Sequence, residues 1–148
     1  MTDKCLTPAG EIRRPDGPEI LFARHELACR KSGGVRFHPG FADSLAMLRM
    51  TFARPMIVTS ACRSAEHNAT MRPRGHPRSL HIYDRCHHGA EGCCAIDIER
   101  QDPEYNARLV ELALKASWAV GVSRSFIHLD RRIDLVGFAR NVFGYGGR

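Results

Sequence analysis

The sequence lacks the features that mark a membrane-spanning protein or a platform for single-stranded nucleic acid. No stretch approaches the roughly 20 consecutive apolar residues of a membrane span, so we expect no membrane insertion. Aromatic residues make up only 7% of the chain, which argues against a stacking surface for nucleic-acid bases. The six cysteines form no Cys-x-x-Cys pair, and we interpret them as buried apolar side chains with room for one disulfide.

The start of the chain also lacks a recognisable export signal. Residues Met1–Asp16 carry charges and proline but no apolar run like the central region of a secretory signal peptide. We therefore expect synthesis in the cytoplasm without a signal peptide.

The size and charge that are present fit one basic domain. With 148 residues, 43% of them hydrophobic, the chain can bury a single core but is too short for two ordinary domains. The formal charge of +6 favours an anionic partner. Because the arginines are spread from Arg13 to Arg148 rather than gathered in one block, we expect that partner not to be a nucleic acid.

Local patterns predict two main helices. Apolar residues recur at helical spacing over residues 39–53, which indicates an amphipathic helix. Asp102 followed by Pro103 is typical of a helix start, and Gly121 is placed to end that second helix.

Three short apolar runs, residues 56–61, 93–99 and 125–131, predict strands. Residues 1–20 are rich in proline and glycine and predict an extended N-terminal arm, followed by one domain over residues 21–148. The predicted fold class is α+β, a small, mainly antiparallel sheet backed by the two helices, with the functional side chains on a face of the sheet.

Two histidines and an aspartate stand on short, apolar, β-prone segments. Alternation along strands lets Asp97 and His128 meet across paired strands, and His81 lies on another such segment. Two imidazoles and a carboxylate can hold one zinc ion and leave its fourth position to water, as in hydrolytic zinc sites. The alternative is that Asp97 pairs with an arginine and both histidines are ordinary core residues.

Four short motifs follow one another along the chain. They are Ser60-Ala61-Cys62-Arg63-Ser64-Ala65-Glu66-His67-Asn68, Ser79-x-His81, Ala95-x-Asp97 and Phe126-x-His128-x-Asp130. Together they resemble the zinc D-Ala-D-Ala metallopeptidases, the DD-carboxypeptidase and endolysin family that cleaves peptidoglycan stem peptides. The resemblance covers about residues 22–132 and is nearest to the small members from bacteriophages and prophages.

The resemblance implies a zinc ion held by His81, Asp97 and His128. It implies a metallopeptidase, of carboxypeptidase or murein endopeptidase type, that hydrolyses D-amino-acid-containing bonds of stem peptides or cross-links. It also implies action at the bacterial cell wall, after release during lysis or as part of a virion with phage tail proteins as partners. The alternatives are a non-catalytic virion or tail module that binds the wall or other virion proteins, and a DNA-binding zinc module.

The spacing of the first two ligands departs from the family pattern. His81 and Asp97 are sixteen residues apart, against seven in most relatives, and residues 83–92 form an insertion. Because the glycine, alanine and aspartate of the motif remain before and at Asp97, we expect the strand ends to stay in place and the insertion to form a lip beside the substrate. The competing interpretation is a structural zinc site made by Cys86, His88, Cys93 and Cys94.

The proton acceptor is a second departure. Many relatives carry an acid or a histidine two or three positions before the last ligand, where this chain has Phe126 and Ser125. Asp130 shares a strand face with His128, so it is the candidate general base. The equal alternative is that Asp130 orients the imidazole of His128.

Three further residues complete the predicted site. Arg63 would stabilise negative charge on the reacting carbonyl or bind a substrate carboxylate, although a surface ion pair with Glu66 is the alternative. Ser79 would contact the substrate or fix its turn. Arg131, with its neighbour Arg132, would bind carboxylates of the polymer.

Overall fold

The computed structural model describes residues 3–135 and 142–144, so the last residues of the predicted domain, 145–148, lie outside the described part. The helices are α1 (Arg24–Leu27), α2 (Phe41–Phe52), α3 (Ala65–Thr70) and α4 (Pro103–Lys115). The strands are β1 (Ile12–Arg13), β2 (Ile20–Phe22), β3 (Val58–Ser60), β4 (Cys86–His87), β5 (Ala90–Glu91), β6 (Ala95–Glu99), β7 (Ala119–Val122), β8 (Phe126–Asp130) and β9 (Val142–Gly144). Of these helices, none is long and apolar enough to cross a membrane.

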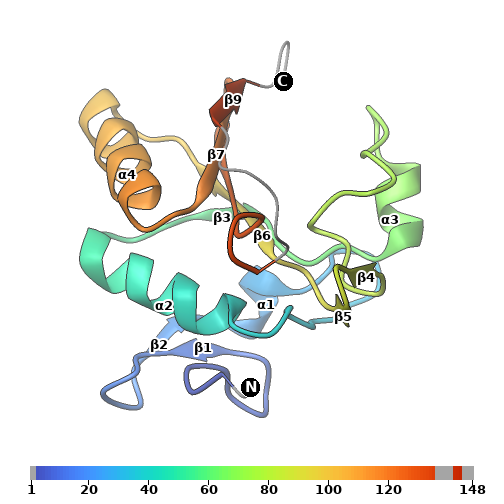
Figure 1. The fold of residues 1–148 in the computed structure, drawn as a ribbon, viewed down its shortest axis with the longest axis horizontal. Helices are drawn as coiled ribbons and strands as arrows, with labels where there is room; N and C mark the ends of the chain where they lie inside the picture. The colour runs from blue at the N-terminus through green and yellow to red at the C-terminus, as the bar shows by residue number, and fades with distance from the viewer. Residues whose placement is uncertain (1–2, 136–141, 145–148) are drawn as a thin grey trace.

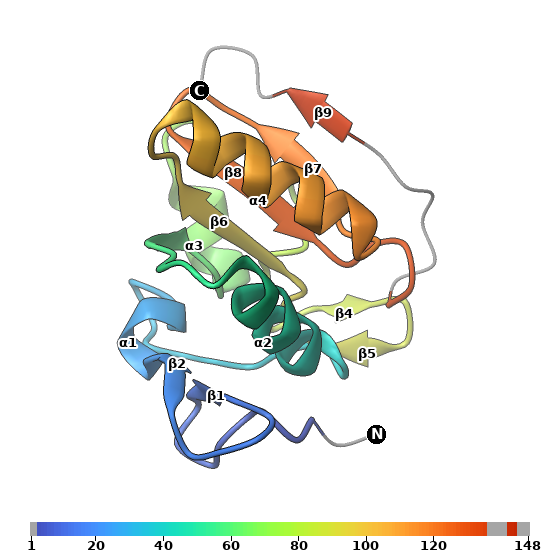
Figure 2. The same ribbon diagram turned by 90° about the vertical axis from the view of Figure 1, so that its left-hand side faces the viewer.

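Five of the strands form a central sheet in the order β3-β6-β8-β7-β9. Neighbouring strands are antiparallel except for the parallel pair β7 and β9. Helices α2 and α4 lie together on one side of this sheet, and α3 lies on the other (Figures 1 and 2). The predicted α+β class with a mainly antiparallel sheet and two main helices is confirmed.

Strand alternation separates a core face of the sheet from a polar face. Ile96 of β6 and Leu129 of β8 are fully buried and belong to the same hydrophobic core as Leu109 of α4. Burying each such side chain contributes roughly 1.5–3 kcal/mol. The residues in between point to the opposite face, where the register pairs Asp97 directly with His128.

The first main helix begins at Phe41, two residues after the predicted start, and the second begins where the sequence predicts but ends earlier. The Asp102 carboxylate accepts a hydrogen bond from the backbone N–H of Tyr105 at 2.9 Å, as an N-cap should. The helix ends at Lys115, and Ser117 adopts a left-handed φ of 66°. Gly121 therefore does not end the helix. It lies within β7, a short apolar segment that forms a strand because it pairs with β8.

The N-terminal arm is packed against the rest of the molecule. Its strand β1 pairs with β2, and Ile12 is fully buried. The Asp3 carboxylate accepts hydrogen bonds from the backbone N–H groups of Gly40 and Asp43, at 2.9 and 3.0 Å, at the start of α2. Residues 3–20 thus supply both core and capping contacts, while the division of the chain at residue 20 stays a prediction.

The insertion at residues 83–92 folds into the β4–β5 hairpin. His88 and Gly89 form its two-residue turn, and both have positive φ, as the tight turns of hairpins require. The His87 ring donates a hydrogen bond from Nε2 to the carbonyl of Ile82 at 2.7 Å. The ring of His38 in turn donates to the carbonyl of His87 at 2.8 Å. The hairpin is therefore anchored at its base.

Candidate metal centre

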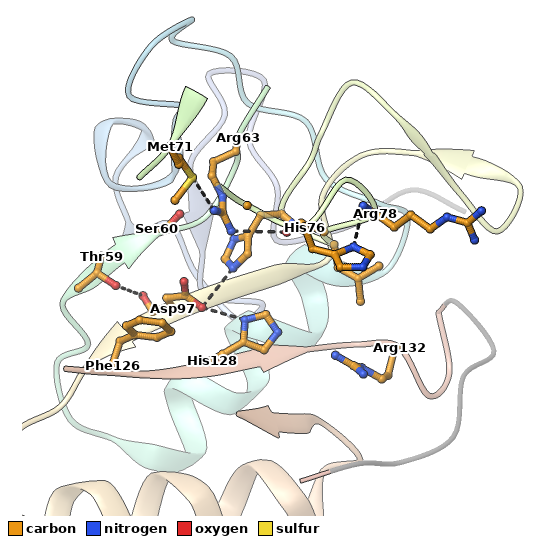
Figure 3. A pocket seen from close by; sticks show the side chains of 14 residues that line it. Thr59, Ser60, Arg63, Met71, His76, Arg78, Asp97, Phe126, His128 and Arg132 are labelled. Carbon is orange, nitrogen blue, oxygen red and sulfur yellow. Dashed lines mark hydrogen bonds and ion pairs between the residues drawn. The ribbon is translucent and has the colours of Figure 1, made fainter. Parts of the chain in front are cut away.

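The three predicted ligands converge on the polar face of the sheet. Oδ1 of Asp97 lies 3.1 Å from Nε2 of His81 and 2.9 Å from Nδ1 of His128. All three potential ligand atoms lie within 4.8 Å of one another, and all three side chains are buried. Figure 3 shows the ring of His128 turned toward the carboxylate of Asp97.

Hydrogen bonds on the far side of each ring fix which nitrogen faces Asp97. Nδ1 of His81 lies 2.7 Å from the backbone carbonyl of Ala61, so this nitrogen carries the proton and Nε2 presents its lone pair. Nε2 of His128 lies 2.8 Å from a carboxylate oxygen of Asp130, which leaves Nδ1 to face Asp97. Two ring nitrogens and one carboxylate oxygen are thus directed at the same point.

This donor set fits a zinc ion. Around a tetrahedral zinc at the usual bond lengths, ligand atoms lie about 3.3 Å apart, close to the two separations measured from Asp97. Burial lowers the pKa of His81, so its ring is neutral and its lone pair meets a carboxylate oxygen without a proton between them. A cation at this point removes that repulsion.

Without a metal, the cluster holds a proton instead. Burial disfavours a charged His128 ring, but hydrogen bonds to Asp130 and Asp97 outweigh it and raise the pKa of His128 to about 9. Burial likewise opposes ionisation of Asp97, and attraction to the two histidines nevertheless lowers the pKa of this carboxyl. The metal-free site is therefore a carboxylate–imidazolium pair at neutral pH.

Asp130 lies behind His128, on the side of the ring away from Asp97. Its side chain is fully buried, and Arg132 pairs with it at 2.7 Å. Burial opposes ionisation, but hydrogen bonds from His128 and Arg132 lower the pKa of Asp130 to about 2. Asp130 is therefore an ionised carboxylate in contact with the ring of a predicted ligand.

A cavity of about 680 Å³ opens in front of the cluster. His81, Asp97 and His128 line it together with Arg63 and Ser79, so five of the predicted site residues meet there. The Arg63 side chain lies beside Met71 and is 3.5 Å from the Ser79 hydroxyl (Figure 3). That hydroxyl also accepts a hydrogen bond from the backbone N–H of His81 at 3.2 Å, which fixes the turn before this ligand.

The structure also places the partner considered for Arg63, and Arg131 itself, relative to the cavity. Glu66, the surface partner considered for Arg63, forms an ion pair with Lys31 at 3.3 Å. Arg131 does not reach the cavity: its guanidinium stacks 4.8 Å over the Trp118 ring on the core side of the sheet. Arg132, the next residue, lines the cavity in its place.

A second zinc site does not form in the described part of the chain. There the only group of side chains able to hold a metal is the His81, Asp97 and His128 cluster. Cys86 is exposed on the hairpin, whereas Cys93 and Cys94 are fully buried. The hairpin packs toward residues 36–38, with an Arg36 to Glu91 ion pair at 2.6 Å, and none of its residues is among those that line the cavity.

Several residues of the cavity wall were not predicted from the sequence. Met71, His76 and Arg78 come from the loop between α3 and His81. The backbone N–H of Gly75 donates to the Asn68 carbonyl, and the Asn68 amide donates to the His76 carbonyl. Asn68 closes the first of the four motifs, so its presence was the available signal that this loop would fold back against α3.

Comparison with known proteins gives one match. A family model described as Peptidase M15 matches residues 21–130, which include all three cluster residues and Asp130. Neither the comparison with curated proteins nor that with solved structures found a match.

Proposed function

Because the chain belongs to the peptidase M15 family of zinc-dependent peptidases, we propose that it hydrolyses D-amino-acid-containing bonds of peptidoglycan stem peptides or cross-links. The observation that carries the proposal is the convergence of His81, Asp97 and His128 on the floor of a cavity. A zinc ion bound there supplies a Lewis acid and activates water at neutral pH.

Other side chains of the cavity wall are placed to bind the substrate. Arg63 lies where its guanidinium can bind the reacting carbonyl or a substrate carboxylate and stabilise developing negative charge. Arg78 adds positive charge to the wall, whereas the charge of Arg132 is balanced by its ion pair with Asp130. With Asp97 as the only carboxylate among the described residues of that wall, the cavity favours a substrate that carries carboxylates, as stem peptides do.

We assign Asp130 the role of positioning His128 rather than that of general base. The carboxylate touches the ring on the side opposite Asp97 and is not among the residues of the cavity wall, so it does not reach a substrate there. A carboxylate bonded to the far nitrogen of a ligand histidine fixes the ring and increases its basicity.

The test of the peptidase is metal-dependent cleavage. The purified protein is incubated with murein and with stem peptides, and new amino and carboxyl termini are counted with chelator, without it and after zinc is restored. We expect cleavage only with metal, its loss in His81→Gln and its retention in His25→Gln, a matched change at an exposed histidine. Cleavage that is indifferent to chelator would contradict the zinc mechanism.

The chemical form of the substrate can be tested in the same assay. Peptides that end in a free carboxylate are compared with the same peptides as C-terminal amides. Preference for the acid supports a carboxypeptidase, and equal rates support an endopeptidase that acts within cross-links.

One observation favours a second candidate, a non-catalytic virion or tail module. No described carboxylate of the cavity wall other than Asp97 is available as proton acceptor, and the positions two and three before His128 are Phe126 and Ser125. Binding of zinc and of murein without any cleavage would support this module. Location at the bacterial cell wall, after lysis or on a virion, remains a proposal for both candidates.

A further inference from the structure

Two buried thiols, those of Cys62 and Cys93, face each other between strands β3 and β6. Sγ of Cys62 lies 3.1 Å from Sγ of Cys93, although the residues are 31 positions apart in the chain. Cys62 follows the end of β3, and Cys93 precedes the start of β6. Because β3 and β6 are antiparallel neighbours, the fold itself brings these two ends together.

The backbone on both sides of the pair is fixed. The N–H of Cys62 donates to the Leu27 carbonyl at 3.0 Å, and the N–H of Cys93 donates to the Arg36 carbonyl at 2.9 Å. The carbonyl of Cys93 accepts a further bond from the N–H of His38 at 2.9 Å. Bonded sulfurs lie about 2.05 Å apart, so an approach of roughly 1 Å by rotation of the side chains is sufficient.

The other cysteines are not placed in this way. Cys29 contacts Ser64 and His67, Cys86 is exposed on the hairpin, and Cys5 is buried near α2. Among the six cysteines, all of which lie in the described part of the chain, no other two sulfur atoms are in contact.

We propose that Cys62 and Cys93 form a disulfide when the protein folds in the presence of a small-molecule disulfide such as oxidised glutathione. One protein thiolate attacks the oxidant and releases one reduced thiol, and the second thiolate then displaces the other. The two protein thiols lose two electrons, the oxidant gains them, and both protons end on the released thiols. The proposal does not depend on peptidase activity.

Burial decides when the bond forms. Removal from water, and then the contact with Cys62, hold the pKa of Cys93 well above its usual range, so reactive thiolate is scarce in the folded protein. Oxidation should therefore be fast during refolding and slow afterwards. Once formed, the bond is sheltered from reductants for the same reason.

The bond would connect two parts of the site. Cys62 directly precedes Arg63, and Cys93 precedes the strand that carries Asp97. The folded chain already holds these segments together. The bond therefore stabilises the protein mainly by lowering the conformational entropy of the unfolded chain. We expect the oxidised protein to melt about 5–10 °C above the reduced protein.

The experiment maps the cysteines after refolding of the full chain in a glutathione redox buffer. Free thiols are alkylated, and the intact mass and the non-reduced peptides are measured. We expect the intact mass of the reduced chain less two hydrogen atoms plus four alkyl additions, and one peptide pair that joins Cys62 to Cys93. Six alkylated cysteines, a bond between another pair, or equal melting temperatures of the oxidised and reduced protein would overturn the proposal.

Variants separate this pair from its neighbours. Cys94→Ala, adjacent in sequence, and Cys86→Ser, on the surface, should keep both the bond and the rise in melting temperature. Cys62→Ser and Cys93→Ser should lose both. If a buried substitution prevents folding, the cysteine mapping of the unaltered chain still tests the proposal.

Discussion

At the scale of single residues, Asp130 is the side chain whose assignment the structure changes most. The sequence places it on the same strand face as His128, and it is indeed there, but the alternation of side chains cannot say how a ring is turned. The ring directs Nε2 toward Asp130 and Nδ1 toward Asp97. The carboxylate of Asp130 thus contacts the ring of a predicted ligand, which is the arrangement of the second of the two roles considered for it.

This assignment predicts the behaviour of Asp130→Asn. Loss of the charge behind His128 should weaken zinc binding about 10–100-fold, as other carboxylates behind ligand histidines do. Competition with a chromophoric chelator measures the affinity. Asp134→Asn, at an exposed carboxylate beside Arg131, is the control and should bind zinc normally. Wild-type affinity together with lost cleavage would instead identify Asp130 as the base.

The raised pKa of His128 predicts how the stability of the metal-free protein depends on pH. A pKa raised from 6.5 to about 9 means that the folded state holds the proton more tightly than the unfolded state. The stabilisation is complete below about pH 6.5 and disappears as the pH rises through 9. The difference corresponds to about 3 kcal/mol.

Urea unfolding of chelator-treated protein at pH 6 and pH 9 tests this dependence. His128→Gln removes the titrating group, so subtraction of its pH profile isolates the contribution of His128 from that of the cysteines. A wild-type stability that rises relative to the variant between these pH values would show that the sign is wrong.

At the scale of elements, local signals predicted the starts of helices better than their ends. Asp102 caps α4 through a hydrogen bond to its first turn, and a cap depends only on neighbours in sequence. Strand β7 depends on its pairing with β8, which lies later in the chain. That is why Gly121 was interpreted as a helix end.

The close approach of two segments at Gly92 gives an element-scale prediction. A Cβ there would lie 2.3 Å from the backbone carbonyl carbon of Phe37, and φ is 118°. The turn residue Gly89 also has a positive φ, of 94°, but meets nothing within 4 Å. Gly89→Ala should therefore cost about 1–2 kcal/mol from backbone strain alone, and Gly92→Ala about 2 kcal/mol more from the clash.

Urea unfolding of the two glycine variants checks this difference. Equal losses of stability would mean that the contact between Gly92 and Phe37 tolerates a side chain.

At the scale of the whole molecule, the sequence predicted the layers but not how its first residues are used. Composition suggested a separate arm, because residues 1–20 are rich in proline and glycine. The structure uses the few apolar residues among them, including Ile12, as part of the core. Such burial depends on distant segments and leaves no periodic signal in so short a stretch.

Removal of residues 1–20 is therefore expected to destabilise the domain. The deletion takes away the buried Ile12 and the Asp3 carboxylate at the start of α2. Asp3→Ala alone should cost about 1 kcal/mol, the usual contribution of a cap. Thermal unfolding compares both changes with the full chain. A deletion variant with the same melting temperature as the full chain would confirm the predicted boundary at residue 20.

The tight turn at His88 and Gly89 has one more consequence for the molecule. A hairpin that begins and ends at neighbouring points lengthens the chain between two ligands without lengthening the distance between them. The number of residues from His81 to Asp97 is thus free to vary, while the site it serves keeps its shape. The open tip at Gly89 is accordingly a position where a peptide tag can be added with little effect on the metal centre.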